Sequence, residues 1–234
     1  SDAGVEPLQQ LPNLQELGLN ETQVGDAGLE SIRKFPALIA LRLEATPISD
    51  AGLKHLTDLK YLKKFTLTRT QIGDDGLKHL SGLTDVDQLF LSGTRVTDAG
   101  MPHLAKLVNL NELELEDTQV TGKGLGQLDG LKYLKMLRLD RAQITDEGMQ
   151  DLPAWPYLTT LTLNETQITD EGLEHLGKYP YLKWLELYYI FNTEAGSEFY
   201  RLLKRLRHLS LLNTEVTAAG IEELRKALPH CEIE

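Results

Sequence analysis

Apolar residues recur along this chain in a fixed register of 24 positions. Each unit opens on an apolar residue and continues as L-x-x-L-x-L, so that Leu113 and Leu115, for example, alternate with polar residues. This alternation predicts a short strand with one buried face. Later in each unit, G-[LM]-x-x-L predicts a short helix with one apolar side. The opening residues are Leu14, Leu38, Leu62, Val86, Leu110, Leu134, Leu158, Leu182 and Leu206.

The strand and helix of one unit are too short to bury their apolar faces alone, so neighbouring units must stack. Successive strands then run parallel, and a helix connects each strand to the next. Nine full units occupy residues 14–229 without an insertion. Residues 1–13 match only the helical part of a unit, and residues 230–234 match only the beginning of a strand. We therefore expect one solenoid with a truncated first repeat and a C-terminal strand stub.

Three polar positions also recur in most units, and each has a structural explanation. The glycine represented by Gly28 permits close backbone approach or an unusual φ at the start of the helix. The aspartate represented by Asp26 is expected to cap its own helix by accepting free N–H groups. The threonine represented by Thr22 is expected to point inward and to bond neighbouring turns. A residue that repeats every 24 positions belongs to the scaffold, so we assign none of these a catalytic role.

This pattern resembles that of the leucine-rich-repeat superfamily over essentially the whole chain. The T-D-x-G-L segment, as in Thr97 to Met101 with methionine in the last place, is most similar to the ribonuclease-inhibitor-like branch, which includes repeats of planctomycete-type bacterial proteins and of F-box receptors. Threonine stands where many family members carry asparagine or cysteine. The resemblance implies an α/β leucine-rich-repeat solenoid. It would be a right-handed βα horseshoe with a parallel inner sheet of about nine strands and short helices on the convex side.

Charge and cysteine content exclude several classes of function. The formal net charge of −11 argues against phosphate-driven nucleic-acid binding and against attachment to an anionic membrane. The single cysteine, Cys231, permits no intramolecular disulfide and no cysteine-based zinc site, and we expect it to act as a small buried hydrophobe. His55, His79, His103 and His175 share one helix position. A helix spacing of roughly 8–10 Å is long for shared coordination, so we expect a solvated line and no metal.

Departures from the repeat are places where function can be encoded. In the fifth unit Gly122 replaces the aspartate. The eighth unit departs most: Ile190 takes the threonine place, Asn192 takes an apolar place and Glu194 takes the aspartate place. Two outcomes stay open at this point. Either the loop shifts its register so that Ile190 or Phe191 fills the core, or Asn192 finds a specific hydrogen bond; neutral drift would also explain the changes.

Residues that flank the buried leucines of each strand should point to the concave face, where they vary freely on a fixed scaffold. Two groups of such residues gather there. The acidic group lies in the fifth and sixth units and consists of Glu112, Glu114, Glu116, Asp117 and Asp140. The aromatic group lies in the eighth unit and consists of Trp184, Tyr188 and Tyr189. Aromatic anchors beside a charged patch are typical of a protein-binding hot spot. The predicted ligand-binding residues are Phe90, Glu112, Glu114, Glu116, Met136, Arg138, Asp140, Trp184, Glu186, Tyr188 and Tyr189.

No Ser/His/Asp or Cys/His arrangement, P-loop or dinucleotide fingerprint appears, so the sequence predicts a non-catalytic protein without a cofactor. The first hypothesis is a protein-interaction module that binds a protein or peptide on its concave face. The alternatives are a structural spacer in a larger protein and the substrate-recognition arm of a multidomain enzyme. The first strand, near Leu17, should present an open edge through which copies could self-associate. Nothing in the sequence indicates a compartment.

Overall fold

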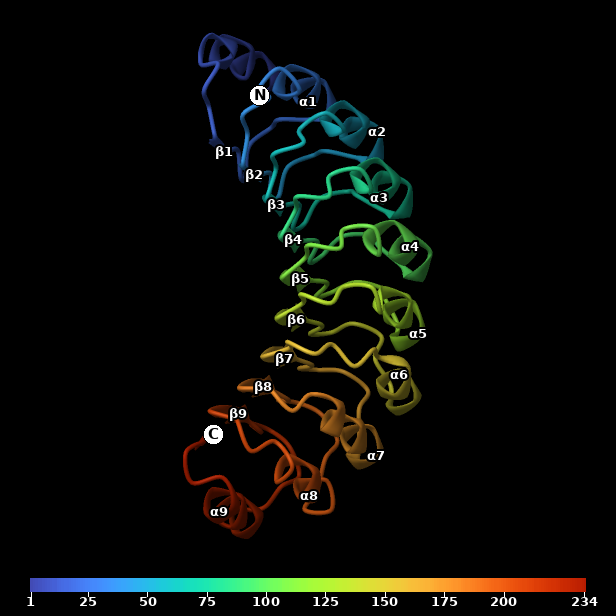
Figure 1. Ribbon diagram of the computed structural model, residues 1–234, viewed down its shortest axis with the longest axis vertical. Coiled ribbons are helices and arrows are strands. Elements are labelled where there is room, and N and C mark those ends of the chain that lie inside the picture. The colour runs from blue at the N-terminus through green and yellow to red at the C-terminus, as the bar shows by residue number, and fades with distance from the viewer.

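The computed structural model describes residues 1–234 as one curved solenoid built on a single parallel sheet of ten strands in sequence order. Figure 1 shows the strands along the concave side and the helices along the convex side, with the two ends of the chain far apart. The tenth strand lies within residues 230–234, and the expected parallel inner sheet of about nine strands is confirmed. The strands are β1 (Glu16–Gly18), β2 (Ala40–Arg42), β3 (Lys64–Thr66), β4 (Gln88–Phe90), β5 (Glu112–Glu114), β6 (Met136–Arg138), β7 (Thr160–Thr162), β8 (Trp184–Glu186), β9 (His208–Ser210) and β10 (Glu232–Ile233).

Each strand leads through a turn to a short helix on the convex side. The α-helices are α1 (Asp26–Ile32), α2 (Asp50–Leu53), α3 (Asp74–Leu80), α4 (Met101–Leu104), α5 (Gly122–Leu125), α6 (Asp146–Asp151), α7 (Asp170–Leu173), α8 (Ser197–Tyr200) and α9 (Ala218–Ala227). Several are extended by a turn of 3-10 helix, namely η3 (Lys54–Leu56), η4 (Asp98–Gly100), η5 (Gly126–Leu128) and η6 (Glu174–Lys178). In the partial first repeat the helical segment is 3-10 helix only, in η1 (Asp2–Gly4) and η2 (Glu6–Gln10).

The repeat keeps its register in space. Residues that are 24 positions apart pair across the sheet, for example Leu89 with Leu113 and Leu113 with Leu137. Their side chains join one hydrophobic core of 61 buried residues that runs the length of the solenoid. Every repeat therefore depends on its neighbours to cover its apolar face.

The repeated threonines do not bond neighbouring turns, so that prediction was wrong. The Thr94 hydroxyl donates to the carbonyl of Leu91 at 2.6 Å, and Thr118 donates to Leu115 at 2.6 Å. Each hydroxyl thus closes the turn of its own repeat by donating to the carbonyl three residues back.

The repeated aspartates supply the contact between turns. The Asp98 carboxylate accepts the backbone N–H of Thr121 at 2.8 Å and its hydroxyl at 2.6 Å. Asp74 bonds Thr97 in the same way. The prediction that each aspartate caps its own helix was therefore wrong, because the carboxylate reaches the start of the next repeat's helix.

The recurring glycine makes room for this carboxylate. A Cβ at Gly124 would overlap the Asp98 carboxylate, and a Cβ at Gly196 would overlap that of Asp170. None of the recurring glycines has a positive φ. Of the two predicted explanations, close approach is confirmed and an unusual φ is not observed. Left-handed backbone occurs instead just after each strand, at residues such as Arg141 (φ 57°).

In the eighth repeat the loop does not shift its register. Ile190 is 2% exposed in the core, whereas Phe191 projects outward and is 70% exposed. Asn192 is fully buried, and its amide donates to the Tyr200 hydroxyl at 2.6 Å. Two further core positions have changed here. Tyr200 stands where other repeats carry mostly leucine, and Ser197 stands where they carry leucine, methionine, isoleucine or valine.

Candidate functional site

The predicted binding residues lie on β4, β5, β6 and β8 or just after β5, β6 and β8, on a concave face that is partly filled by its own side chains. Because adjacent strands lie about 4.8 Å apart, large side chains cover their smaller neighbours. Eight of the residues that flank the leucines, and were expected to point to this face, are therefore buried. The buried ones are Ala40, Thr66, Ser92, Asp140, Thr162, Asn164, His208 and Ser210.

The acidic group on β5 and β6 surrounds one arginine. The Arg138 guanidinium lies 3.7 Å from a carboxylate oxygen of Glu114 and 3.7 Å from one of Glu116. Its Nε is buried and has no hydrogen-bond partner. One cation thus faces two carboxylates at a distance longer than a direct hydrogen bond.

Burial raises the pKa of Glu114, and Arg138 opposes this shift. Burial also raises the pKa of Glu116, and the nearby negative charge of Asp140 adds to the rise. Asp140 itself is 9% exposed, and burial raises its pKa. These carboxylates are therefore held at an electrostatic cost, which a positive group from outside would relieve.

The charges just beyond the strands are paired more tightly. The Arg141 guanidinium donates to both oxygens of Asp117, at 2.6 and 2.7 Å, and to Glu165 at 3.2 Å. This pairing lowers the pKa of Asp117. The unbalanced negative charge of this region is therefore left on Glu112, Glu114, Glu116 and Asp140, which share Arg138.

Asn164 connects the acidic and aromatic groups. Its N–H donates to Asp140 at 3.0 Å and its side-chain amide donates to Glu186 at 3.0 Å. Its amide oxygen accepts the N–H of Tyr188 at 2.9 Å. Asn164, which is 1% exposed, thus connects the sixth, seventh and eighth repeats, and its side chain bonds two of the predicted binding residues, Glu186 and Tyr188.

Trp184 is held in one orientation although 43% of its surface is exposed. Its ring stacks on His208 with 3.8 Å between ring centroids and 17° between planes. Its indole N–H donates to Glu186 at 2.6 Å. A stacking partner below and a hydrogen bond at one edge leave the other ring face to solvent.

The other aromatic residues of the eighth repeat lie at the opposite end of β8. The Tyr188 hydroxyl donates to Glu165 at 3.3 Å, and its ring meets that of Tyr189 edge-on with centroids 5.6 Å apart. Tyr189 is 58% exposed, and the neighbouring Phe191 and Leu212 also project into solvent. An exposed apolar group therefore ends this strand.

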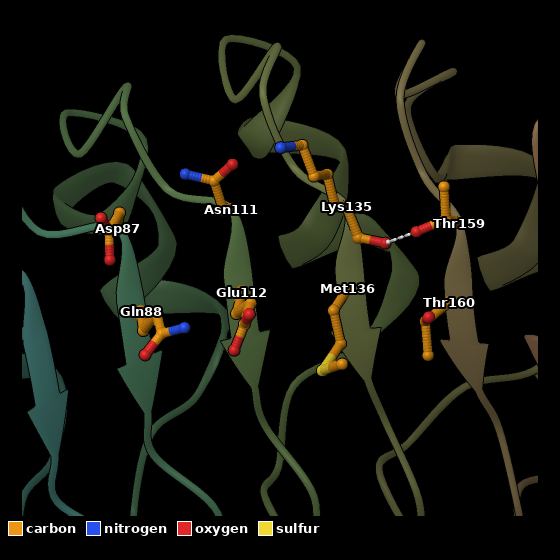
Figure 2. A pocket seen from close by; sticks show the side chains of 8 residues that line it. All are labelled: Asp87, Gln88, Asn111, Glu112, Lys135, Met136, Thr159 and Thr160. Carbon is orange, nitrogen blue, oxygen red and sulfur yellow. Dashed lines mark hydrogen bonds between the residues drawn. The ribbon is translucent and has the colours of Figure 1, made fainter.

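The remaining predicted residues lie toward the start of the strands or on β4. The Lys64 amine covers the Phe90 ring at 5.2 Å, so this ring is already in a cation–π contact. Glu112 and Met136 line a shallow polar hollow of about 400 Å³. Figure 2 shows this hollow across β4 to β7, with Lys135 at its upper margin and the Thr159 hydroxyl bonded to the Lys135 carbonyl.

No group of three or more His, Cys, Asp or Glu side chains is arranged to hold a metal ion. None of the helices is both long and apolar enough to span a bilayer. Cys231 is partly buried at the edge of the core, and burial raises the pKa of its thiol to about 11, so the unreactive thiol form predominates at neutral pH.

The protein-family model that describes a leucine-rich repeat region matches residues 6–214. The chain belongs to the leucine-rich-repeat family. No curated protein matches it. Among solved structures, internalin C2 from Listeria monocytogenes is 24% identical with a TM-score of 0.66, over 93% of this chain and 84% of that one. Another Listeria internalin is 17% identical with a TM-score of 0.56, over 99% and 86%. A leucine-rich-repeat protein from Leptospira interrogans is 21% identical with a TM-score of 0.50, over 98% and 74%. At these identities the similarity shows the fold.

In this leucine-rich-repeat chain, the residues that organise the concave face were not singled out from the sequence. Asn164 and His208 stood in the surface columns but were given no role. One signal was available for Asn164, because Asn20, Asp140 and Asn164 share one repeat position and each accepts the N–H of the next repeat there. No such signal marked His208, whose contact with Trp184 depends on the side-chain rotamer.

Proposed function

We propose that this chain is a non-catalytic protein-interaction module whose concave face binds a protein or peptide. The observation that carries the proposal is Trp184, an exposed indole that is fixed by stacking on His208 and by a hydrogen bond to Glu186. Fixing an exposed aromatic side chain before binding reduces the entropy lost on association. Tryptophan, tyrosine and arginine are the residues that contribute most to interface hot spots.

The charges of this face favour a cationic ligand segment. Five acidic residues lie on β5 and β8 or just after β5 and β6, namely Glu112, Glu114, Glu116, Asp140 and Glu186, whereas Arg138 is the one cation on strands β5 to β8. An incoming lysine or arginine would offset the cost that raises the pKa of Glu114 and Glu116. We infer that the partner presents basic side chains to β5 and β6 and an apolar side chain to Trp184.

Paired variants test this proposal. The protein would be used to capture partners from an extract of its source, and the affinity of each purified partner would then be measured by calorimetry. Trp184→Ala and Glu114→Lys should each weaken binding about tenfold or more, as hot-spot substitutions do. Tyr61→Ala is the matched aromatic control, because Tyr61 is 64% exposed and lies outside the binding residues.

Unchanged affinity in both concave variants would remove this site assignment. Failure of the folded wild-type protein to retain any specific partner would instead favour a spacer. A partner that is turned over, with loss of turnover in Trp184→Ala, would contradict the non-catalytic assignment.

We also propose that the repeats belong to the ribonuclease-inhibitor-like branch, in a bacterial protein of the planctomycete type. The T-D-x-G-L segment supports the branch, and the Listeria and Leptospira structures support the bacterial origin. A phylogeny of individual repeats tests the assignment.

A further inference from the structure

A second surface lies outside the proposed concave site, at the margin where β6 to β9 begin. Six cations flank the opening leucines of three of these four repeats, the seventh having none, and no acidic residue occupies the equivalent positions in any of the four. They are Lys132, Lys135, Lys183, Lys204, Arg205 and Arg207. We call this surface the basic rim. In a chain of net charge −11, such local separation of charge needs an explanation.

Three tyrosines in consecutive repeats are part of the same rim. Tyr133, Tyr157 and Tyr181 share one repeat position and are 54%, 54% and 44% exposed. The Arg205 guanidinium occupies the next place in this column and stacks over the Tyr181 ring at 4.3 Å. The column thus presents exposed aromatic rings followed by an arginine whose position is fixed by stacking.

The cations of the rim are free to bind a ligand. All six are exposed, and none takes part in an ion pair within the protein. Their backbone is nevertheless fixed by the sheet. The N–H of Thr159 donates to the Lys135 carbonyl at 2.9 Å, and the N–H of Lys183 and of Arg207 continue this ladder at 2.8 Å each. The rim is therefore a rigid row of unpaired positive charges.

The same margin has a different character in the two preceding repeats. There the equivalent positions carry Asp85, Asp87, Asn109 and Asn111, which line a neighbouring polar hollow. Figure 2 shows the boundary, with Asp87 and Asn111 on one side and Lys135 on the other. Cations also occupy this margin in the third repeat, at Lys60 and Lys63, but there Asp85 and Asp87 adjoin them. The stretch with several cations and no acidic residue is thus confined to the last four repeats.

We propose that the basic rim binds an acidic segment of a protein partner in extended conformation. Three inter-strand steps of about 4.8 Å make the rim roughly 14 Å long, which matches about four residues of extended chain. Tyrosine and arginine are typical of protein-binding hot spots. A nucleic acid binds through its high linear charge density, and a protein of net charge −11 repels such a polymer over long range, whereas a short acidic segment responds mainly to the rim.

Selection from random dodecapeptides displayed on phage, with the intact chain as bait, tests this inference. Glutamate- and aspartate-rich peptides should be enriched. A selected peptide, labelled with fluorescein, should bind less tightly as NaCl rises, because salt screens exposed charges. The rim variant Lys135→Glu/Tyr157→Ala/Lys183→Glu should weaken binding of this peptide at least about tenfold.

The third repeat offers a matched control, since Lys60, Tyr61 and Lys63 occupy rim positions beside Asp85 and Asp87. Lys60→Glu/Tyr61→Ala/Lys63→Glu makes the same change of charge and aromatic area and should leave the affinity unchanged. Trp184→Ala/Glu114→Lys should also leave it unchanged, which separates the rim from the proposed concave site.

Two results would overturn the inference. One is the absence of acidic enrichment, or equal peptide binding by the rim variant. The other is binding of single-stranded oligo-dT or heparin to the rim at concentrations where no peptide binds, which would assign the surface to another class of polyanion.

Discussion

The fifth repeat (residues 110–133) and the eighth repeat (residues 182–205) both depart from the common pattern, but the structure accommodates them differently. In the fifth, Gly122 replaces the aspartate that bonds the next repeat. Its backbone packs directly on Gly148, with no space left for a Cβ. The apolar residues of this repeat, such as Leu125 and Leu128, keep their usual places in the core.

In the eighth repeat the core itself is rebuilt. Tyr200 is larger than the usual leucine, and Ser197 is smaller than the usual apolar residue. Asn192 then supplies the hydrogen bond that a buried tyrosine hydroxyl requires. In the fifth repeat, a closer approach of the backbone thus needs one substitution, at Gly122. In the eighth repeat, a change in the volume and polarity of the core needs three substitutions that depend on each other, at Asn192, Ser197 and Tyr200.

The largest expected effect is therefore at Tyr200. Tyr200→Ala should lower the free energy of unfolding by about 3–5 kcal/mol, because it leaves a large cavity and an unpaired Asn192 amide. Urea unfolding followed by circular dichroism measures the loss.

The triple variant Asn192→Val/Ser197→Leu/Tyr200→Leu restores the usual residues and should recover most of the wild-type stability. Each single change should be destabilising, since neighbours that share a packing site are not additive. Additive effects of the three changes would show that they are independent.

The fifth repeat should be sensitive at Gly122. Gly122→Ala places a Cβ against the Gly148 backbone, and overpacking of this kind costs about 1–3 kcal/mol. Gly18→Ala is the matched control, because its Cβ would meet no atom within 4 Å. Equal denaturation midpoints for the two variants would mean that α5 can move away from α6 at little cost.

Gly122 cannot form the hydrogen bonds between repeats that an aspartate forms at this position. The contribution of those bonds to stability can be measured at Asp98, the equivalent residue of the preceding repeat. Asp98→Ala removes the acceptor of the Thr121 N–H and hydroxyl and should cost about 1–3 kcal/mol, since hydrogen bonds to charged groups fall in this range. Thermal unfolding checks the effect, and Glu194→Ala, where one carboxylate oxygen accepts only at the exposed start of α9, should cost less.

The comparison also explains what could be predicted from the sequence. Stacking, register and strand direction follow from the 24-residue period, because only one arrangement buries every leucine. The partners of Asp98 and Thr94 did not follow, since periodicity gives a residue's place in the repeat but does not say which repeat its side chain bonds. Asn192 was recognised as a departure, and its partner Tyr200 was missed because an aromatic residue at an apolar position gives no signal of its own.

The sequence predicted the binding residues as equivalent strand positions in successive repeats, but it did not predict the side chains that surround them. The sequence placed Trp184 and Glu114 on strands of the inner sheet, and they lie on β8 and β5, while their role in binding stays a prediction. It gave no indication of the His208 ring beneath Trp184 or of the depth at which Glu114 lies. The stacking of Trp184 on His208 and the burial of Glu114 both depend on the relative sizes of side chains in adjacent repeats. This information is not contained in the sequence of a single repeat.

The smallest effect is expected at Glu114, and its dependence on pH makes it informative. Because burial raises the pKa of Glu114 above its unfolded value, the folded state binds the proton more tightly and ionisation near pH 7 lowers stability. Glu114→Gln should therefore increase the free energy of unfolding at pH 7, by about 0.5 kcal/mol. This advantage should shrink as the pH falls through the raised pKa, and it should vanish below the ordinary carboxyl value, where both states are protonated.

Glu112→Gln, on the same strand but beside the open hollow, provides the same change of charge as a control. A loss of stability in Glu114→Gln at pH 7 would mean that attraction to Arg138 outweighs burial, and the acidic group would then be a balanced ion-pair cluster with little to gain from a cationic ligand.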